Sequence, residues 1–261
     1  MTSDTALATL NGATELSDTQ AAVMAETQAD IEATAFEFQP PKVRMPSGGV
    51  KAFTTDDGDV IQPGWTGIIA VSQMARAYWP TKDATGLPPL CSSPDSLNGW
   101  LGDELEKDQV KAALGAEVRH PLLSALDGTR GPQSCSHCPL SAWGSGEGRG
   151  QACKALRRLL VIPAGWHMPA ILTLPPTSVK IFDQYASARQ RTPGQSYFTV
   201  LTRFDLDTRR NGAGTEYAVI KLSVAGILDD AQIAAVLALR TQYAELVRAL
   251  EITAAEYDLG V

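Results

Sequence analysis

The residues best suited to chemistry are four cysteines that fall within one stretch of the chain. Cys91, Cys135, Cys138 and Cys153 are its only cysteines, and all lie between residues 80 and 153. Cys135-Ser-His-Cys138 has the Cys-x2-Cys spacing that lets two sulfurs face one ion. Fourteen residues separate Cys138 from Cys153, and 43 residues separate Cys91 from Cys135. The set predicts a structural Zn²⁺ site with four thiolate ligands.

Other uses of these cysteines stay open. A redox pair would stand at the mouth of a βαβ unit, whereas here Gly-Pro-Gln-Ser precedes the pair and Pro-Leu-Ser follows it. Disulfides or free thiols are the remaining options, and a reducing cytosol disfavours disulfides. His137 could replace one ligand, although we expect it to be exposed. Four thiolates would close the site to water, which argues against a catalytic metal.

Signatures of enzyme classes are absent from the sequence. There is no HExxH motif, no Walker loop and no nucleophile elbow. The glycines of GSGEGRG (144–150) lack the preceding strand of a dinucleotide fingerprint, so we interpret this stretch as the tip of the zinc loop. No two groups stand out as an acid and a base. We therefore predict a protein that is not an enzyme.

Charge is distributed unevenly along the chain, whose formal net charge is −7. Residues 1–39 hold seven acidic residues and no Lys or Arg. Residues 141–221 hold 11 basic and five acidic residues, and residues 222–261 hold two basic and six acidic residues. A basic middle indicates an anionic partner, and acidic ends indicate a solvating or regulatory role. The alternative is that this basic block does not form one surface patch.

Single-stranded nucleic acid is held by a cationic groove together with aromatic faces on which bases stack. The aromatic candidates are Trp143, Tyr197 and Phe204, and the basic candidates are Arg149, Lys154, Arg157, Arg158, Arg203, Arg209, Arg210 and Lys221. Core packing is the competing interpretation for most aromatics, but Trp143 lies in a Gly/Ser-rich loop with little core to join. Arg157 and Arg158 are adjacent on a predicted strand, so at most one of them faces a given groove.

The elements that must position these residues are mostly strands. Apolar and β-branched runs predict strands at 50–54, 157–162, 170–175, 197–207 and 215–226. A proline and a Thr/Ser cap begin a helix over 175–190, and Asp229 or Asp230 caps a final helix with an apolar stripe. Residues 67–79 are ambiguous, because their first half favours a strand and their second half could be helical.

This order predicts a mainly β fold with α elements (α+β), namely an OB-like small β-barrel with a cysteine-rich zinc-binding insertion and a C-terminal helix. We divide the chain into an acidic, disordered or loosely helical segment (1–39), an OB-like domain (40–228) containing the insertion (80–153), and a C-terminal helix and tail (229–261). No apolar stretch is long enough to span a bilayer and no secretory signal begins the chain, so we expect a cytosolic location and no membrane partner.

Four stretches in this order resemble a family of phage and prophage proteins: CSSPD, CSHCPLSAWGSG, GQACKALRRLLVI and LPPTSVKIFDQYA. The resemblance covers roughly residues 65–225. The family is taken to comprise single-stranded DNA-binding proteins of phage replication or recombination, acting in the bacterial host cytosol. The resemblance supports the four cysteines as ligands but identifies no DNA contacts. The plan is also similar to that of the helix-destabilising proteins of large tailed phages, which carry a zinc element on an OB-fold; that likeness is one of architecture alone.

The sequence thus favours a zinc-stabilised protein that binds single-stranded DNA with little sequence preference. Phosphate contacts imply a log–log salt slope of about −0.7 for each phosphate on a single strand. The acidic N-terminal segment would compete for the groove or recruit replication or recombination proteins. The alternative is a zinc-stabilised protein–protein interaction module without nucleic-acid binding. A continuous basic groove with aromatics would favour DNA, and scattered charge beside an exposed apolar patch would favour a protein.

Overall fold

The computed structural model describes residues 39–46, 51–80, 88–102, 133–146, 150–212, 214–253 and 256, together with isolated positions between 10 and 29. The expectation for segment 1–39 falls mostly outside these residues. Arg149, one of the predicted phosphate contacts, also lies outside them. None of the helices in the described part of the chain is long and apolar enough to cross a membrane.

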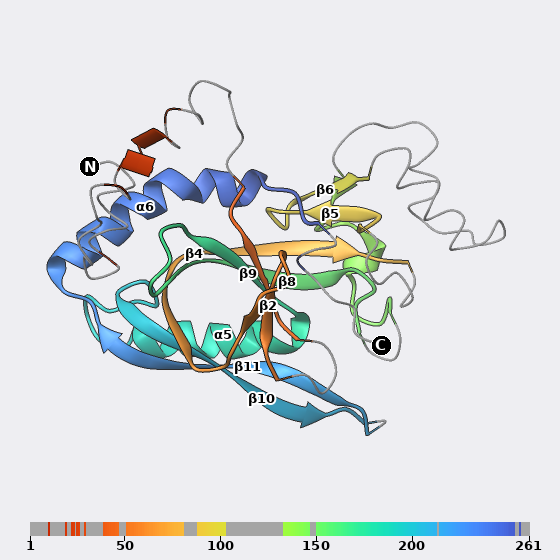
Figure 1. Cartoon of the computed structure of the whole chain (residues 1–261). Helices are drawn as coiled ribbons and strands as arrows, with labels where there is room; N and C mark the ends of the chain where they lie inside the picture. The colour runs from red at the N-terminus through yellow and green to blue at the C-terminus, as the bar shows by residue number, and fades with distance from the viewer. Residues whose placement is uncertain are drawn as a thin grey trace.

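The described residues form a mixed α/β fold that is rich in strands (Figure 1). The strands are β1 (Lys42–Arg44), β2 (Phe53–Thr55), β3 (Val60–Ile61), β4 (Trp65–Tyr78), β5 (Cys91–Ser93), β6 (Asn98–Leu101), β7 (Gln133–Ser134), β8 (Lys154–Pro163), β9 (Ala170–Leu174), β10 (Val200–Arg210) and β11 (Glu216–Ile227). The helices whose bounds are described are the short 3-10 helix η1 (Pro139–Ser141), α5 (Pro176–Arg189) and α6 (Asp230–Ala249).

Strand β4 is the centre of one curled sheet. Along one path the strands follow the order β3-β2-β1-β9-β8-β4-β5-β6-β7, and β10 also joins β4 and carries β11 on its other side. The beginning of β4 pairs with β10 and its end pairs with β5, while β8 pairs along most of its length. Gly67 lies where β4 meets both β8 and β10, and a Cβ there would come within 2.9 Å of the Ile162 carbonyl oxygen. The absence of a side chain therefore permits this close approach.

The sheet curls without closing into a barrel, since no pairing joins β9 to β11 among the described strands. The free edge of β9 is instead taken by β1, which pairs with it in parallel. On the β11 side, the Ile220 amide donates a hydrogen bond to the Ser178 hydroxyl of α5 at 3.1 Å. Helix α5 thus satisfies a backbone group where a closing strand would otherwise pair.

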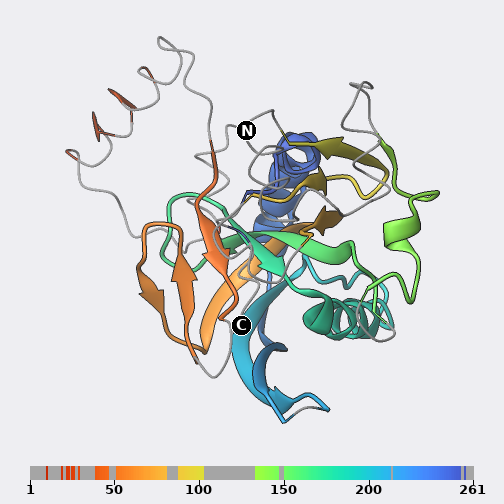
Figure 2. The ribbon, with the colours of Figure 1, turned by 90° about the vertical axis from the view of Figure 1, so that its right-hand side faces the viewer.

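The two helices lie on opposite sides of the sheet (Figures 1 and 2). Successive side chains of β8 point to opposite faces, as the strand period requires. Leu160 and Ile162 pack in the core beneath α6, whereas Leu159 and Val161 pack in the core beside α5. Because both faces of β8 are buried, its sequence is a continuous apolar run, and this run is the pattern that predicted the strand.

Helix α6 begins with a complete capping box. The Gln232 amide donates to the Asp229 carboxylate, and the Gln232 side-chain oxygen accepts from the Asp229 amide. The buried stripe comprises Ala235, Val236, Leu239, Tyr243 and Val247. Leu237 is apolar as well, but it lies off this stripe and is exposed at 47%.

Arg240 fastens α6 to a bulge in β4. The register of β4 against β8 shifts between Ile69 and Val71, which leaves the Ala70 carbonyl outside the regular ladder. Arg240 donates to that carbonyl and to the Tyr197 hydroxyl, and its guanidinium lies 4.1 Å from the centre of the Phe198 ring. The bulge thus gives α6 a polar anchor within an apolar interface.

Candidate functional site

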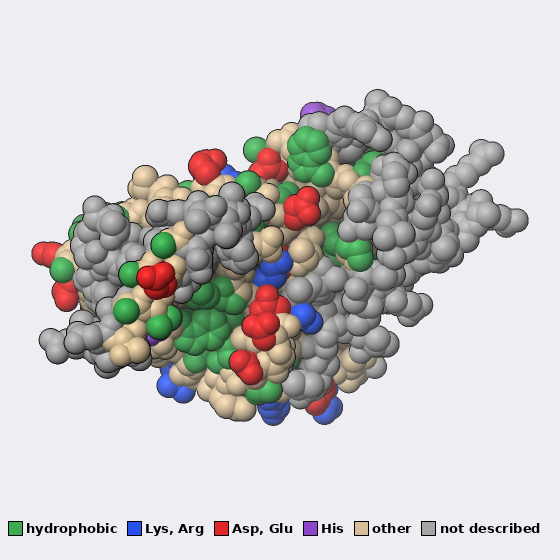
Figure 3. Space-filling view, turned by 45° about the horizontal axis from the view of Figure 1, so that its top comes forward, with side chains coloured by type: hydrophobic (Ala, Val, Ile, Leu, Met, Phe, Trp, Pro, Cys, Tyr) green, Lys and Arg blue, Asp and Glu red, His purple; other side chains and the backbone are tan. Residues whose placement is uncertain are grey.

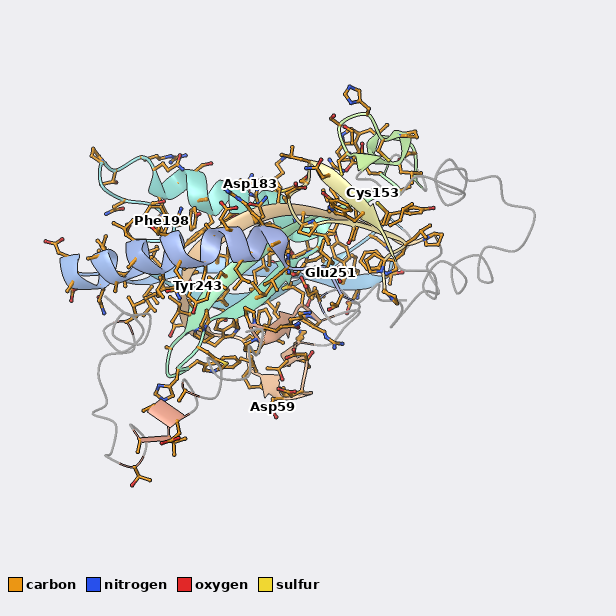
Figure 4. The ribbon with its side chains drawn as sticks, turned by 90° about the horizontal axis from the view of Figure 1, so that it is seen from above. Asp59, Cys153, Asp183, Phe198, Tyr243 and Glu251 are labelled. Atoms are coloured by element: carbon orange, nitrogen blue, oxygen red, sulfur yellow. The ribbon has the colours of Figure 1, made fainter. Side chains whose placement is uncertain are left out.

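The four cysteines line a single cavity of about 20 Å³, room for little more than one water-sized sphere. Strand β4 brings two of them together, because Tyr78 at its end pairs with Cys91 on one side. On the other side, Ala77 pairs with Lys154, the residue after Cys153. We call the described residues 88–102, 133–146 and 150–153 the cysteine lobe. Figure 4 shows Cys153 of this lobe well away from Phe198 and Tyr243 in the α6 region.

Hydrogen bonds shape the Cys-x2-Cys turn. The Ser141 hydroxyl lies 2.8 Å from the carbonyl oxygens of both Cys135 and Cys138. The Cys153 amide donates to the Leu140 carbonyl at 2.9 Å, which ties the third cysteine to the turn. Leu140 is buried in a small apolar cluster with Tyr78, Leu90 and Cys153. The lobe therefore has a small core of its own.

All four cysteines are free thiols in the structure. Burial, followed by the nearby cysteines, raises the pKa of Cys91 to about 12. Burial likewise raises the pKa of Cys153 to about 12, although the Arg76 guanidinium opposes this shift. Burial also raises the pKa of Cys135. As long as no metal ion binds in the cavity, the thiols of Cys91, Cys135 and Cys153 are protonated at neutral pH.

The cavity fits a thiophilic metal ion in its chemistry but does not present a finished coordination shell. Among the described residues, no three Cys, His, Asp or Glu side chains converge closely enough to hold an ion as they stand. Yet all four cysteines line one cavity, and four thiolates are a typical donor set for structural zinc. The cavity also receives Arg76, whose Nη1 is buried without a hydrogen-bond partner. Binding would require small movements of the cysteine side chains.

His137 does not line the cavity. It is exposed, and its Nδ1 lies 3.2 Å from the Ser134 hydroxyl and 3.0 Å from the Ser136 hydroxyl. The expectation that His137 is exposed is therefore confirmed. The four cysteines remain the candidate ligands.

Two of the predicted nucleic-acid contacts are fully buried, so we remove them from the candidate set. The Arg158 side chain is 0% exposed and donates to both carboxylate oxygens of Glu256, at 2.9 and 3.0 Å. Phe204 is also 0% exposed, and its ring stacks on Trp65 with centroids 4.1 Å apart. Neither side chain can meet a phosphate or a base in this conformation.

Several other predicted contacts are engaged within the protein. Arg157 pairs with Asp183 of α5, Arg203 with Asp205, and Arg210 with Glu216. Tyr197 is half-buried between Phe182 and Phe198, and the Lys154 ammonium donates to the Gln151 carbonyl. Together with the Arg158–Glu256 pair, carboxylates thus neutralise four arginines of the basic block. On the face shown in Figure 3, Lys and Arg side chains are interspersed with Asp and Glu rather than gathered.

The remaining predicted contacts are open to solvent. Trp143 is 80% exposed, in the loop after η1. Arg209 and Lys221 are exposed on the β10–β11 hairpin, where Lys221 stands opposite Asp205 and Arg209 opposite Tyr217. These three residues keep the properties for which the sequence singled them out.

Two further residues matter that the sequence analysis did not select. Trp100 on β6 is 53% exposed, while its neighbour Gly99 lines the cysteine cavity. Strand alternation explains this, since Trp100 must then point away from the cavity. Arg76 had no such signal, because its place in the cavity depends on the pairing of β4 with both β5 and β8.

Comparison with known proteins leaves the chain without a match: no family model, no curated protein and no solved structure is similar to it by significant score.

Proposed function

We propose that this protein binds single-stranded DNA without sequence preference, and that a structural Zn²⁺ held by Cys91, Cys135, Cys138 and Cys153 stabilises the cysteine lobe. It would act as a binding protein rather than an enzyme. In a phage-infected or lysogenic bacterial cytosol it would serve replication or recombination. Its acidic segment 1–39 would then recruit partner proteins or compete with DNA.

The observation that carries the proposal is the order of strand pairing. β4 pairs antiparallel with β8, β8 with β9, β10 with β4, and β10 with β11. Helix α5 stands between β9 and β10 in the chain. This order supports the plan of a five-stranded OB-fold with its helix before the last hairpin, left partly open between β9 and β11. On this plan β4, β8, β9, β10 and β11 are strands one to five.

The OB plan also indicates where a ligand would bind. OB-folds use the face of strands two and three together with the loops joining strands one to two and four to five. The first of these loops contains the cysteine lobe, and the second is the tip of the β10–β11 hairpin. Both lie on the same side of the molecule in Figure 1. The exposed Trp143, Arg209 and Lys221 thus belong to these two regions.

Helix α6 limits which surfaces of the proposed OB-fold DNA could reach. It covers the outer face of β4 and β8 in a core that includes Ile68, Leu160 and Ile162. A strand of DNA could not reach that face without displacing the helix. We therefore place the proposed path over the cysteine lobe and the hairpin. Trp143 and Trp100 would stack on bases, and Arg209 and Lys221 would contact phosphates.

Fluorescence anisotropy of a labelled oligo-dT tests this proposal, using metal-quantified protein at about 50 and about 200 mM salt. Trp143→Ala and Trp100→Ala should each weaken binding by about 1–3 kcal/mol. The Arg209→Ala/Lys221→Ala variant should make the log–log salt slope shallower by about 1.4, for two lost phosphate contacts. Arg248→Ala, which removes an exposed cation of α6, is the matched control and should change neither quantity. No binding at low salt, with or without residues 1–39, would exclude the proposal.

The second candidate is a protein-docking module, and the dispersed charge favours it. Ion pairs occupy many of the basic residues, while Leu97 and Trp100 form exposed apolar surface on the cysteine lobe. If these side chains meet a protein instead of bases, the two tryptophan variants should leave oligonucleotide affinity unchanged at both salt concentrations. The same anisotropy series therefore discriminates between the two functions.

A further inference from the structure

Arg76 occupies an unusual place for an arginine. It lies near the end of β4, opposite Ser93 of β5 on one side and Ala155 of β8 on the other. From there it lines the cavity that the four cysteines share, and among the described residues that line this cavity it is the one charged side chain. The Arg76 side chain thus contributes to the wall of a cavity that four cysteines also line.

Within the described part of the chain, no Asp or Glu forms an ion pair with Arg76. Asp95, the acidic residue among the described residues of the lobe, already accepts from the amides of Leu97 and Asn98 and from the Ser93 hydroxyl. The Nη1 atom of Arg76 is buried and makes no hydrogen bond. A buried donor without an acceptor costs free energy, so an acceptor is expected in the functional state.

The cysteines that line the same cavity are the acceptors available to Arg76 once a metal ion binds there. Four thiolates around a divalent cation carry a net charge of about −2, and such a centre is stabilised by donors to its sulfurs.

We propose that Arg76 is a positioning residue for the metal centre, donating hydrogen bonds to ligand sulfur and offsetting the negative charge of the tetrathiolate. The inference rests on the proposed zinc site and assigns one further residue to it. It also accounts for a half-buried arginine on β4 whose Nη1 atom is buried without a hydrogen-bond partner. Without Arg76, the metal-free fold could persist while the affinity for zinc falls.

Zinc affinity measured by chelator competition on the full chain tests this role. Arg76→Met should raise the zinc dissociation constant about 10- to 100-fold, the usual effect of losing an outer partner of a metal ligand. Arg76→Lys should lose less zinc affinity, because lysine keeps the positive charge and lacks only the planar guanidinium group with its paired donors. Arg44→Met is the matched control, since Arg44 is a partly buried arginine on β1 with an unpartnered Nε. It should bind zinc as the wild type does.

The cobalt(II)-substituted protein adds a spectroscopic test. In Arg76→Met, the loss of a hydrogen bond to ligand sulfur should shift the sulfur-to-cobalt charge-transfer band. In Arg76→Lys, the band should return largely to its wild-type position. If Arg76→Met does not fold, Arg76→Gln provides an uncharged donor for the same measurements. Wild-type affinity within twofold in Arg76→Met, or an equal loss in Arg44→Met, would overturn the inference while leaving the zinc site intact. A wild-type protein that binds no zinc would overturn both, and the anisotropy experiment would still decide DNA binding independently.

Discussion

Arg157 and Arg158 illustrate how adjacent residues of one strand acquire different partners. Arg157 faces α5, where it pairs with Asp183 and lies over the Phe182 ring. Arg158 faces α6, where it binds Glu256 and the carbonyls of Val247 and Leu250 at the end of the helix. A cation at a helix C-terminus is favourable, because the last carbonyls lack partners within the helix.

Arg158→Met should destabilise the fold strongly. The change leaves the Glu256 carboxylate buried with only the Thr173 hydroxyl at 2.9 Å and the more distant Lys42 ammonium at 3.7 Å. Breaking a buried pair from one side costs about 3–5 kcal/mol of unfolding free energy. Urea denaturation measures this loss, and Arg210→Met, which breaks an exposed pair, should cost less than about 1 kcal/mol. Equal effects in the two variants would contradict the argument.

The thiols predict a specific dependence of stability on pH in the metal-free protein. Their ordinary pKa is 9.0, and burial raises the pKa of Cys91 and Cys153 to about 12. The folded state therefore holds protons that the unfolded chain releases above about pH 9. The contribution of these thiols to stability is present below that pH and is lost progressively between pH 9 and 12. Tyr78, whose pKa burial raises to about 12, acts in the same direction.

Urea denaturation of chelator-treated protein at pH 8 and 10 checks this expectation. The wild type should lose more unfolding free energy between the two pH values than a Cys91→Ala/Cys153→Ala variant, which lacks the two titrating groups. Lysines and other tyrosines titrate in both proteins, so the comparison isolates the thiols. An equal loss in both proteins would show that the two thiols do not ionise differently in the folded and unfolded states.

Strands and helices were more predictable from the sequence than their contacts. The apolar runs at 157–162, 170–175, 197–207 and 215–226 correspond to β8, β9, β10 and β11, and the helix predicted over 175–190 is α5. The ambiguous segment 67–79 is β4, in which Ala75 and Ala77 are buried and Met74 and Arg76 are less so. That alternation has the strand period, but alanines give it little contrast.

The contacts of single side chains could not be predicted, because they depend on segments far apart in the chain. Glu256 reaches Arg158 across 98 positions, and Arg240 reaches Ala70 across 170. Nothing in the local pattern of either residue indicates its partner. For the same reason the basic block of residues 141–221 predicted a groove, although carboxylates from other elements neutralise several of its members.

Ser178→Ala tests the idea that α5 completes the open edge of β11. The substitution removes the acceptor of the Ile220 amide, whose segment is buried. An orphaned buried amide costs about 1–3 kcal/mol. Urea denaturation should show that loss, and hydrogen exchange at the Ile220 amide should become faster. The neighbouring Thr177 is exposed, so Thr177→Ala is the control and should have a smaller effect on both measurements.

At the scale of the whole molecule, the apolar cores are unequal. The two larger ones lie above and below the sheet and together bury the faces of β4, β8 and β9. Among the described residues, the core of the cysteine lobe is the small cluster of Leu90, Leu140 and Cys153 with Tyr78 of β4. So small a core contributes little on its own, and a metal ion is a usual substitute for missing apolar burial.

Zinc removal should therefore make the lobe open more readily and spare the remainder of the fold. After treatment with a chelator, we expect the main unfolding transition to keep most of its midpoint temperature, because α6 and α5 still pack on the sheet. Limited proteolysis should then cut within residues 80–153 at sites that are protected in the zinc-loaded protein. Oligonucleotide affinity should decrease when the lobe opens, because the lobe carries Trp143 and Trp100. If instead the whole chain unfolds without zinc, the lobe is integral to the sheet; if binding persists with the lobe cleaved, the DNA path does not cross it.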